Sequence, residues 1–74
     1  MKLNQLPVGE RGIIAAINVH GPVRRRLFDL GFVPGTVVEN VRRSPAGGLN
    51  AYLIRDTLIA LREEASERIL IIRG

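Results

Sequence analysis

The most concentrated chemistry in the chain lies in three consecutive arginines, Arg24-Arg25-Arg26, its only tight cluster of charge. The planar guanidinium group forms paired hydrogen bonds with carboxylates and phosphates, so such a cluster suits an acidic protein surface or a nucleotide phosphate. A charge run is also commonly the solvated face of a helix. Asp29 follows Arg25 by one helical turn, where the two side chains can form an ion pair. The cluster indicates an anionic partner, with a solvated helix face as the alternative.

The residues that catalysis or metal binding would need are sparse. His20 is the only histidine and there is no cysteine, so a metal site would require His20 to converge with carboxylates such as Glu10 or Glu39. Ser44 and Ser66 have no spacing relative to His20 that suggests a catalytic triad. We therefore expect no catalytic residue, no cofactor and no metal ligand. These absences favour a binding module over an enzyme.

Length and composition limit the possible classes of protein. The 74 residues have room for one small domain, residues 1–74. The chain carries 11 Lys+Arg against 7 Asp+Glu, a net charge of +4, which suits nucleic acid, an anionic membrane surface or an acidic protein face. The absence of cysteine fits a reducing compartment, and no apolar stretch is long enough for a signal peptide or a membrane span. We expect a soluble, cytoplasmic protein.

One short helix would carry the arginine cluster. Pro22 suits the first helical turn, where its missing N–H is not needed, and Gly31 can adopt the left-handed conformation that ends a helix. Val23, Leu27 and Leu30 recur at helical spacing and are expected to face the core. After the helix, Pro34-Gly35 predicts a type II turn.

The remaining segments are rich in β-branched and alternating apolar residues and predict five short strands. Ser44 to Gly48 reads as a pliable loop, Asp56-Thr57 as a tight hairpin connection, and 63–67 as a short polar excursion with helical character. A sheet this small must curl to cover its apolar face, so we expect a mostly β fold, a small β-barrel with one short helix inserted after the first strand. The expected strands are Gly12 to Val19, Thr36 to Arg43, Asn50 to Arg55, Leu58 to Arg62 and Ile69 to Arg73.

Three segments in order carry a family resemblance: Leu3 to Gly9, with leucines at its first and fourth positions; Arg26 to Gly35, Arg-Leu-x-x-Leu-Gly-Phe-x-Pro-Gly; and Ile59 to Ala65, which opens Ile-Ala-Leu-Arg. Together they resemble the FeoA family, small SH3-like cytosolic components of bacterial ferrous iron uptake. The resemblance implies an SH3-like barrel and a non-enzymatic accessory role. It also implies a FeoB-type ferrous iron transporter as partner, engaged at its cytosolic GTPase domain or at the cytosolic face of its membrane part. The chain would then meet the membrane only through that partner.

The expected docking surface is the helix with its neighbouring loops. Phe28 lies outside the stripe formed by Val23, Leu27 and Leu30, so it is either covered by the lead-in segment or the Pro45 loop, or exposed as an aromatic anchor beside arginines. The candidate partner-binding residues are Arg24, Arg25, Phe28, Asp29, Pro45, Gly47 and Gly48.

An alternative function is that of a basic SH3-like module that binds nucleic acid or serves a metal-dependent transcriptional regulator. Nucleic acid is not the expected partner, because only two phenylalanines and one tyrosine are available for base stacking and Phe32 is expected in the core. An exposed sheet edge would also allow self-association.

Overall fold

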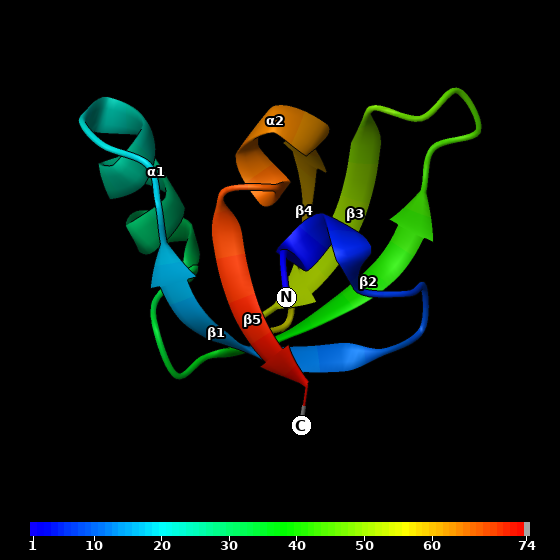
Figure 1. Cartoon of the computed structure of the whole chain (residues 1–74), viewed down its shortest axis with the longest axis horizontal. Coiled ribbons are helices and arrows are strands. Elements are labelled where there is room, and N and C mark those ends of the chain that lie inside the picture. The colour runs from blue at the N-terminus through cyan, green and yellow to red at the C-terminus, as the bar shows by residue number, and fades with distance from the viewer. Residues whose placement is uncertain (74) are drawn as a thin grey trace.

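One antiparallel sheet of five strands dominates the structure, a computed structural model that describes residues 1–73 (Figure 1). The strand order is β4-β3-β2-β1-β5, so β4 and β5 form the two edges. The elements in chain order are η1 (Leu3–Gln5), β1 (Arg11–Ile17), α1 (Pro22–Leu30), β2 (Val37–Arg43), β3 (Leu49–Ile54), β4 (Thr57–Arg62), α2 (Glu63–Ser66) and β5 (Ile69–Arg73).

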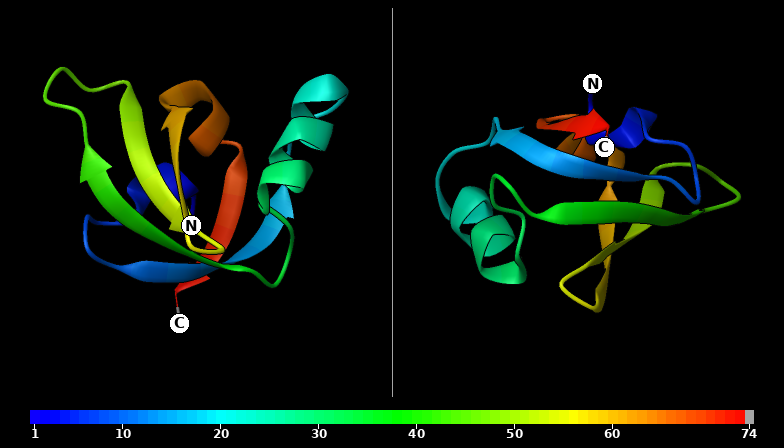
Figure 2. Two further views of the ribbon diagram at one scale, coloured as in Figure 1. Left: turned by 180° about the vertical axis from the view of Figure 1, so that it is seen from behind. Right: turned by 90° about the horizontal axis from the view of Figure 1, so that it is seen from below.

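The sheet is strongly curled, and its inner face encloses the core (Figures 1 and 2). Register shifts between Ile14 and Ala16 in β1, and between Asn40 and Arg42 in β2, interrupt the ladders. Such bulges bend a strand and increase its twist, which is what a small barrel needs. The expected mostly β fold of five strands with a short helix after the first strand is confirmed, and the polar excursion after β4 contains the short helix α2.

Alternating residues of the strands face inward and bury their side chains together with the lead-in leucines and the helix. Phe32, which follows α1, is fully buried as expected, and so is Tyr52 of β3. Burial of large side chains of this kind is the main source of stability in a domain of this size. The core consists of Leu3, Leu6, Ile14, Ile17, Leu27, Phe32, Val38, Tyr52, Ile54, Leu61, Ile69 and Ile71.

The turns around α1 follow the sequence closely. Pro22 is the first residue of the helix, and Gly31 ends it with φ 108°, donating its N–H to the carbonyl of Phe28 at 3.0 Å. Gly35 has φ 93°, and the Thr36 N–H bonds the Val33 carbonyl at 3.1 Å. The expected helix end and type II turn are therefore both confirmed.

Three local expectations were wrong. Val23 does not face the core: it is 54% exposed on the first turn of α1, where an open groove separates the helix from β4, whereas Leu27 is buried and Leu30 is half-buried against the core. The β3–β4 turn is centred on Arg55 and Asp56, with φ 49° and 62°, rather than on Asp56-Thr57. Two adjacent positive φ values define a type I′ turn, whose twist matches that of the strands it joins. Strand β1 runs over Arg11–Ile17 and ends before Val19.

The N-terminal residues cover the β5 edge of the sheet. The amino group of Met1 donates to the carbonyl of Ile71 at 3.0 Å, and the Met1 carbonyl accepts from the Ile71 N–H at 2.8 Å. Lys2 forms an isolated antiparallel β-bridge with Leu70. Next along the chain, the buried side chain of Asn40 donates from Nδ2 to the Leu6 carbonyl at 2.7 Å. The lead-in is thus fixed at both its ends by the sheet that it covers.

Candidate docking surface

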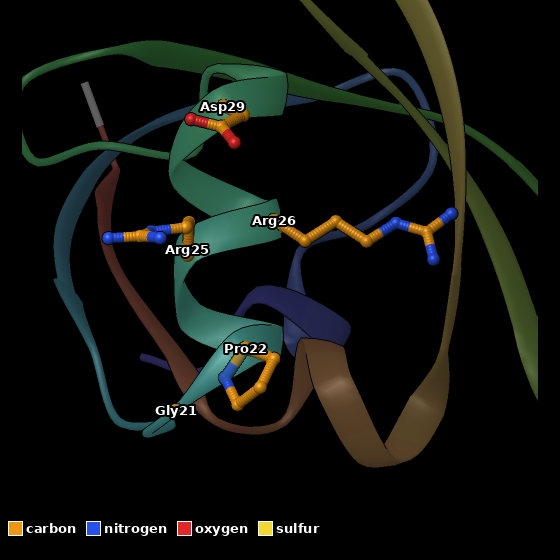
Figure 3. Close-up of a pocket in the computed structure, with 5 residues that line it drawn as sticks. All are labelled: Gly21, Pro22, Arg25, Arg26 and Asp29. Carbon is orange, nitrogen blue, oxygen red and sulfur yellow. The ribbon is translucent and has the colours of Figure 1, made fainter.

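The three clustered arginines do not form one patch. Arg24 turns back to the end of β1, where its Nη1 donates to the carbonyl of Ile17 at 2.7 Å and to that of Val19 at 3.5 Å. Figure 3 shows Arg25 and Arg26 leaving α1 in opposite directions, with Arg26 extending towards β4. Their three directions follow from the angle of about 100° between successive helical residues. A single phosphate or carboxylate cannot be held by all three side chains at once.

Phe28 is half-buried against the core, and its role as an aromatic anchor for a partner stays a prediction. The guanidinium carbon of Arg24 lies 4.7 Å from its ring centroid. Stacking of this kind is attractive because the ring face is electron-rich. The guanidinium group of Arg24 thus covers one face of the Phe28 ring, and the two side chains form a stacked pair on the helix surface.

The outer face of α1 carries a shallow hollow between its first and last turns. Gly21 and Pro22 line it at one end, Arg25 and Arg26 lie along it, and Asp29 lies at the other end (Figure 3). The expected ion pair between Arg25 and Asp29 is not formed: within residues 1–73 the ion pairs join Arg11 to Glu39 and Arg73 to Glu10. Both Arg25 and Asp29 are exposed and available to charged groups of a partner.

The second group of candidate residues lies far from the helix. The β2–β3 loop, which contains Pro45, Gly47 and Gly48, lies at the opposite end of the longest axis from α1 in all three views (Figures 1 and 2). The loop is exposed but braced at its base, since Ser44 Oγ donates to the Gly47 carbonyl at 2.8 Å and the Gly47 N–H returns to the Ser44 carbonyl at 3.0 Å. The structure therefore separates the candidate residues into a helix group and a loop group.

Among residues 1–73, neither the helix group nor the loop group is joined by a cluster of metal-ligating side chains. Within the described residues, His, Cys, Asp and Glu side chains do not gather in threes that could hold a metal ion. His20 is exposed in the segment between β1 and α1, and Glu39 is engaged with Arg11, Nε to Oε1, at 3.3 Å. That the protein binds no metal or cofactor stays a prediction.

A groove that could not be predicted from the sequence lies between α1 and β4. Its walls are formed by Val23, Leu27 and Leu30 on the helix side and by residues 59–62 and Ala65 on the other. The only indication in the sequence was the apolar Val23 beside the three arginines at the start of the helix. The sheet covers only part of the apolar stripe on the helix. The covered part depends on the angle at which the helix packs against the sheet, and residue spacing does not encode that angle.

The fold defines a class of protein: a small SH3-like β-barrel with one helix inserted after the first strand. The FeoA domain family model matches residues 1–73. The chain therefore belongs to the FeoA family, a family of accessory proteins associated with ferrous iron transport.

Three relatives illustrate this membership. The chain is 30% identical over 69 residues to an Fe(2+) transport protein A/Fe(2+) transporter FeoB fusion protein of Porphyromonas gingivalis, covering 93% of this chain but only 8% of that protein. The solution structure of FeoA from Chlorobium tepidum superposes with a TM-score of 0.93 at 32% identity, covering 99% of this chain and 70% of that one. The structure of Stenotrophomonas maltophilia FeoA complexed with zinc, described as an SH3 domain protein, superposes with a TM-score of 0.84 at 29% identity, covering 96% of this chain and 88% of that one.

None of the helices among residues 1–73 is long and apolar enough to cross a membrane.

Proposed function

We propose that this protein is a cytoplasmic, non-enzymatic accessory protein of ferrous iron uptake. It docks to the cytosolic part of a FeoB-type transporter and modulates the GTPase or transport activity of that partner. Residues 1–74 act as a single FeoA-like domain in this role.

The observation that carries the proposal is the relative from Porphyromonas gingivalis, in which an FeoA segment and an FeoB transporter share one polypeptide. Fusion raises the effective concentration of two partners to the millimolar range, which is useful when separate chains must meet to act. The Stenotrophomonas maltophilia protein has also been described as a candidate activating factor of ferrous iron transport.

The outer surface of α1 is the proposed docking surface. It presents the stacked Arg24–Phe28 pair beside the exposed side chains of Arg25 and Asp29. Aromatic and arginine side chains are the residue types that dominate the energetics of protein interfaces. The loop group at Pro45, Gly47 and Gly48 is too distant to join the same small contact, and serves as a second contact point on a large partner.

Regulation follows from differential affinity. A domain that binds one nucleotide state of a GTPase more tightly than the other shifts the partner's population towards the preferred state. The accessory protein needs no catalytic group for this effect. It needs a preformed surface, and hydrogen bonds from Arg24 to the end of β1 tether α1 to the sheet.

The test is an NMR titration of isotope-labelled protein with the cytosolic GTPase domain of the transporter, prepared with GDP and separately with a non-hydrolysable GTP analogue. We expect shifts at α1 that are stronger in one nucleotide state. Because the helix and loop groups lie at opposite ends of the molecule, the same spectra assign docking to one end or to both. Absence of shifts in either state would contradict docking to that domain, and shifts that are equal in both states would contradict regulation through nucleotide state.

A further inference from the structure

The groove between α1 and β4 is a surface of mainly apolar character beside the unpaired outer edge of β4. The helix contributes Leu27, Leu30 and the 54%-exposed side chain of Val23, while β4 contributes Ile59 and Leu61. An exposed aliphatic side chain facing further aliphatic groups across an open groove marks a place where another chain can remove apolar area from water.

The wall of the groove opposite the helix is the free edge of the sheet. Strand β4 pairs only with β3. Its two-residue turn makes Thr57 and Ile54 a hydrogen-bonded pair, so the backbone groups of Leu58 and Ala60 point away from β3. In an antiparallel ladder every second residue bonds to the neighbouring strand, and the hydrogen bond from the Glu63 N–H to the Gly48 carbonyl at 2.9 Å fits this pattern. Within residues 1–73 the outward N–H and C=O groups of Leu58 and Ala60 have no hydrogen-bond partner.

The two edges of the sheet differ in whether another segment of the chain pairs with them. The β5 edge is occupied by Met1 and Lys2, which pair with Ile71 and Leu70. The β4 edge carries neither proline nor lysine nor a covering segment, although proteins commonly use such devices to block an exposed edge. An unprotected edge beside an apolar groove has the form of a strand-addition site, in which backbone bonds supply affinity and pockets for alternate side chains supply specificity.

Charge indicates the chemistry of the occupant. Of the residues that line the groove, the charged ones are Arg26 and Arg62, one on each wall, and both are exposed. Figure 3 shows Arg26 extending from α1 across towards β4. Two guanidinium groups with no carboxylate among the lining residues favour an acidic segment, since arginine binds carboxylates with paired hydrogen bonds.

We propose that an extended, acidic segment of a partner protein binds in this groove as an additional strand on β4, with aliphatic side chains against Val23, Leu27 and Leu30 and carboxylates at Arg26 and Arg62. The proposal is separable from docking through the outer face of α1, because the stacked Arg24–Phe28 pair, Arg25 and Asp29 do not line the groove; Arg26 alone borders both surfaces. It therefore stands or fails without the transporter.

The first experiment selects ligands from a phage-displayed library of random eight-residue peptides on the immobilised 74-residue protein. We expect enrichment of peptides that alternate aliphatic residues and carry Asp or Glu. An enriched peptide, made synthetically, should slow amide hydrogen exchange at Leu58 and Ala60 when it binds. No enrichment, enrichment of basic peptides, or unchanged exchange at these two amides would each overturn the proposal.

Matched variants then locate the site. Val23→Asp places a carboxylate in the groove, and Val37→Asp makes the same change at a position that is 53% exposed on the outer face of the sheet. We expect Val23→Asp to weaken peptide binding at least tenfold and Val37→Asp to leave it within twofold. Equal effects of the two variants would contradict the groove as the site.

Ala60→Pro tests the backbone role directly. Proline removes an N–H that points away from β3 and leaves the β3–β4 ladder its own bonds, so the variant should fold and lose peptide binding. If Ala60→Pro does not fold, the loss of peptide binding in Val23→Asp still tests whether the groove is the binding site. Sedimentation of the free protein completes the experiment, since a stable dimer whose β4 amides are already protected would assign the edge to a second copy of the chain and overturn the proposal.

Discussion

The Nη1 of Arg24 donates a hydrogen bond to the carbonyl oxygen of Ile17 at 2.7 Å and thereby ties α1 to the last residue of β1. The connection between these two elements contains Gly21, with φ 72°, and has little stiffness of its own. The same guanidinium stacks on Phe28 one turn further along the helix. One exposed arginine therefore fixes both the start of the helix and an aromatic ring on its surface.

Replacement of Arg24 by alanine should lower the free energy of unfolding by about 1–2 kcal/mol, because it removes a charged hydrogen bond to a backbone carbonyl and a cation–π contact. The matched control is Arg25→Ala, which removes the neighbouring arginine, a side chain with no hydrogen bond or ion pair among the described residues. Urea denaturation of the two variants checks the difference. Equal losses would show that the carbonyl contact contributes nothing.

Asn40 should be among the polar residues most sensitive to substitution. Its side chain is fully buried and donates to the Leu6 carbonyl, while its backbone bonds Gly9 and Glu10. Asn40→Ala leaves a buried carbonyl without its donor, which costs about 1–3 kcal/mol. Thermal melting should show the loss, and proteolysis should cut the lead-in more readily. Asn18→Ala, at an exposed position in the β1–α1 connection, is the control and should change stability by less than about 0.5 kcal/mol.

The β3–β4 turn offers a stabilising change. Arg55 and Asp56 both have positive φ, a conformation that costs non-glycine residues up to about 1–2 kcal/mol, although aspartate tolerates it better than most. Asp56→Gly should raise the free energy of unfolding by about 0.5–1 kcal/mol, which corresponds to about 4–8 °C per kcal/mol in melting temperature for a domain of this size. Calorimetry provides the measurement. A lower melting temperature would mean that the Asp56 side chain makes a contribution that outweighs backbone strain.

Docking through α1 predicts a charge-dependent affinity. Arg25→Glu should weaken binding to the transporter's GTPase domain at least fivefold without changing the melting temperature, because Arg25 lies on the outer helix face and has no internal partner. Arg42→Glu changes the net charge equally at an exposed position on β2 and serves as the control. Isothermal titration calorimetry with both variants gives the comparison. A loss confined to Arg42→Glu would move the docking surface away from the helix.

Features set by local chemistry could be predicted from the sequence. Pro22, Gly31 and Gly35 each fixed a turn or a helix end, because their backbone preferences act within a few residues. The exposure of Val23 could not be predicted, since it depends on how closely the first turn of α1 approaches β4. The contact of Arg24 with the end of β1 could likewise not be predicted, because no spacing within the helix encodes where that strand ends.

The separation of the candidate site into two groups follows from the order of elements that the sequence predicts. Phe28 precedes β2 and Pro45 follows it, so their connections leave opposite ends of the same strand. The α1–β4 groove, in contrast, could be recognised only in the folded structure, because its two walls come from segments that no sequence motif joins.

The pairing of Met1 with Ile71, 70 positions apart, has a consequence for the order in which the protein folds. Strands β2, β3 and β4 are neighbours in the chain and can assemble through short turns, whereas β1 meets β5 only after a long loop has closed. Long-range closure of this kind is slow and occurs late. We infer that the β2–β3–β4 meander forms first, and that β5 and the lead-in associate in the final, rate-limiting step and are the first segments to detach when the protein unfolds.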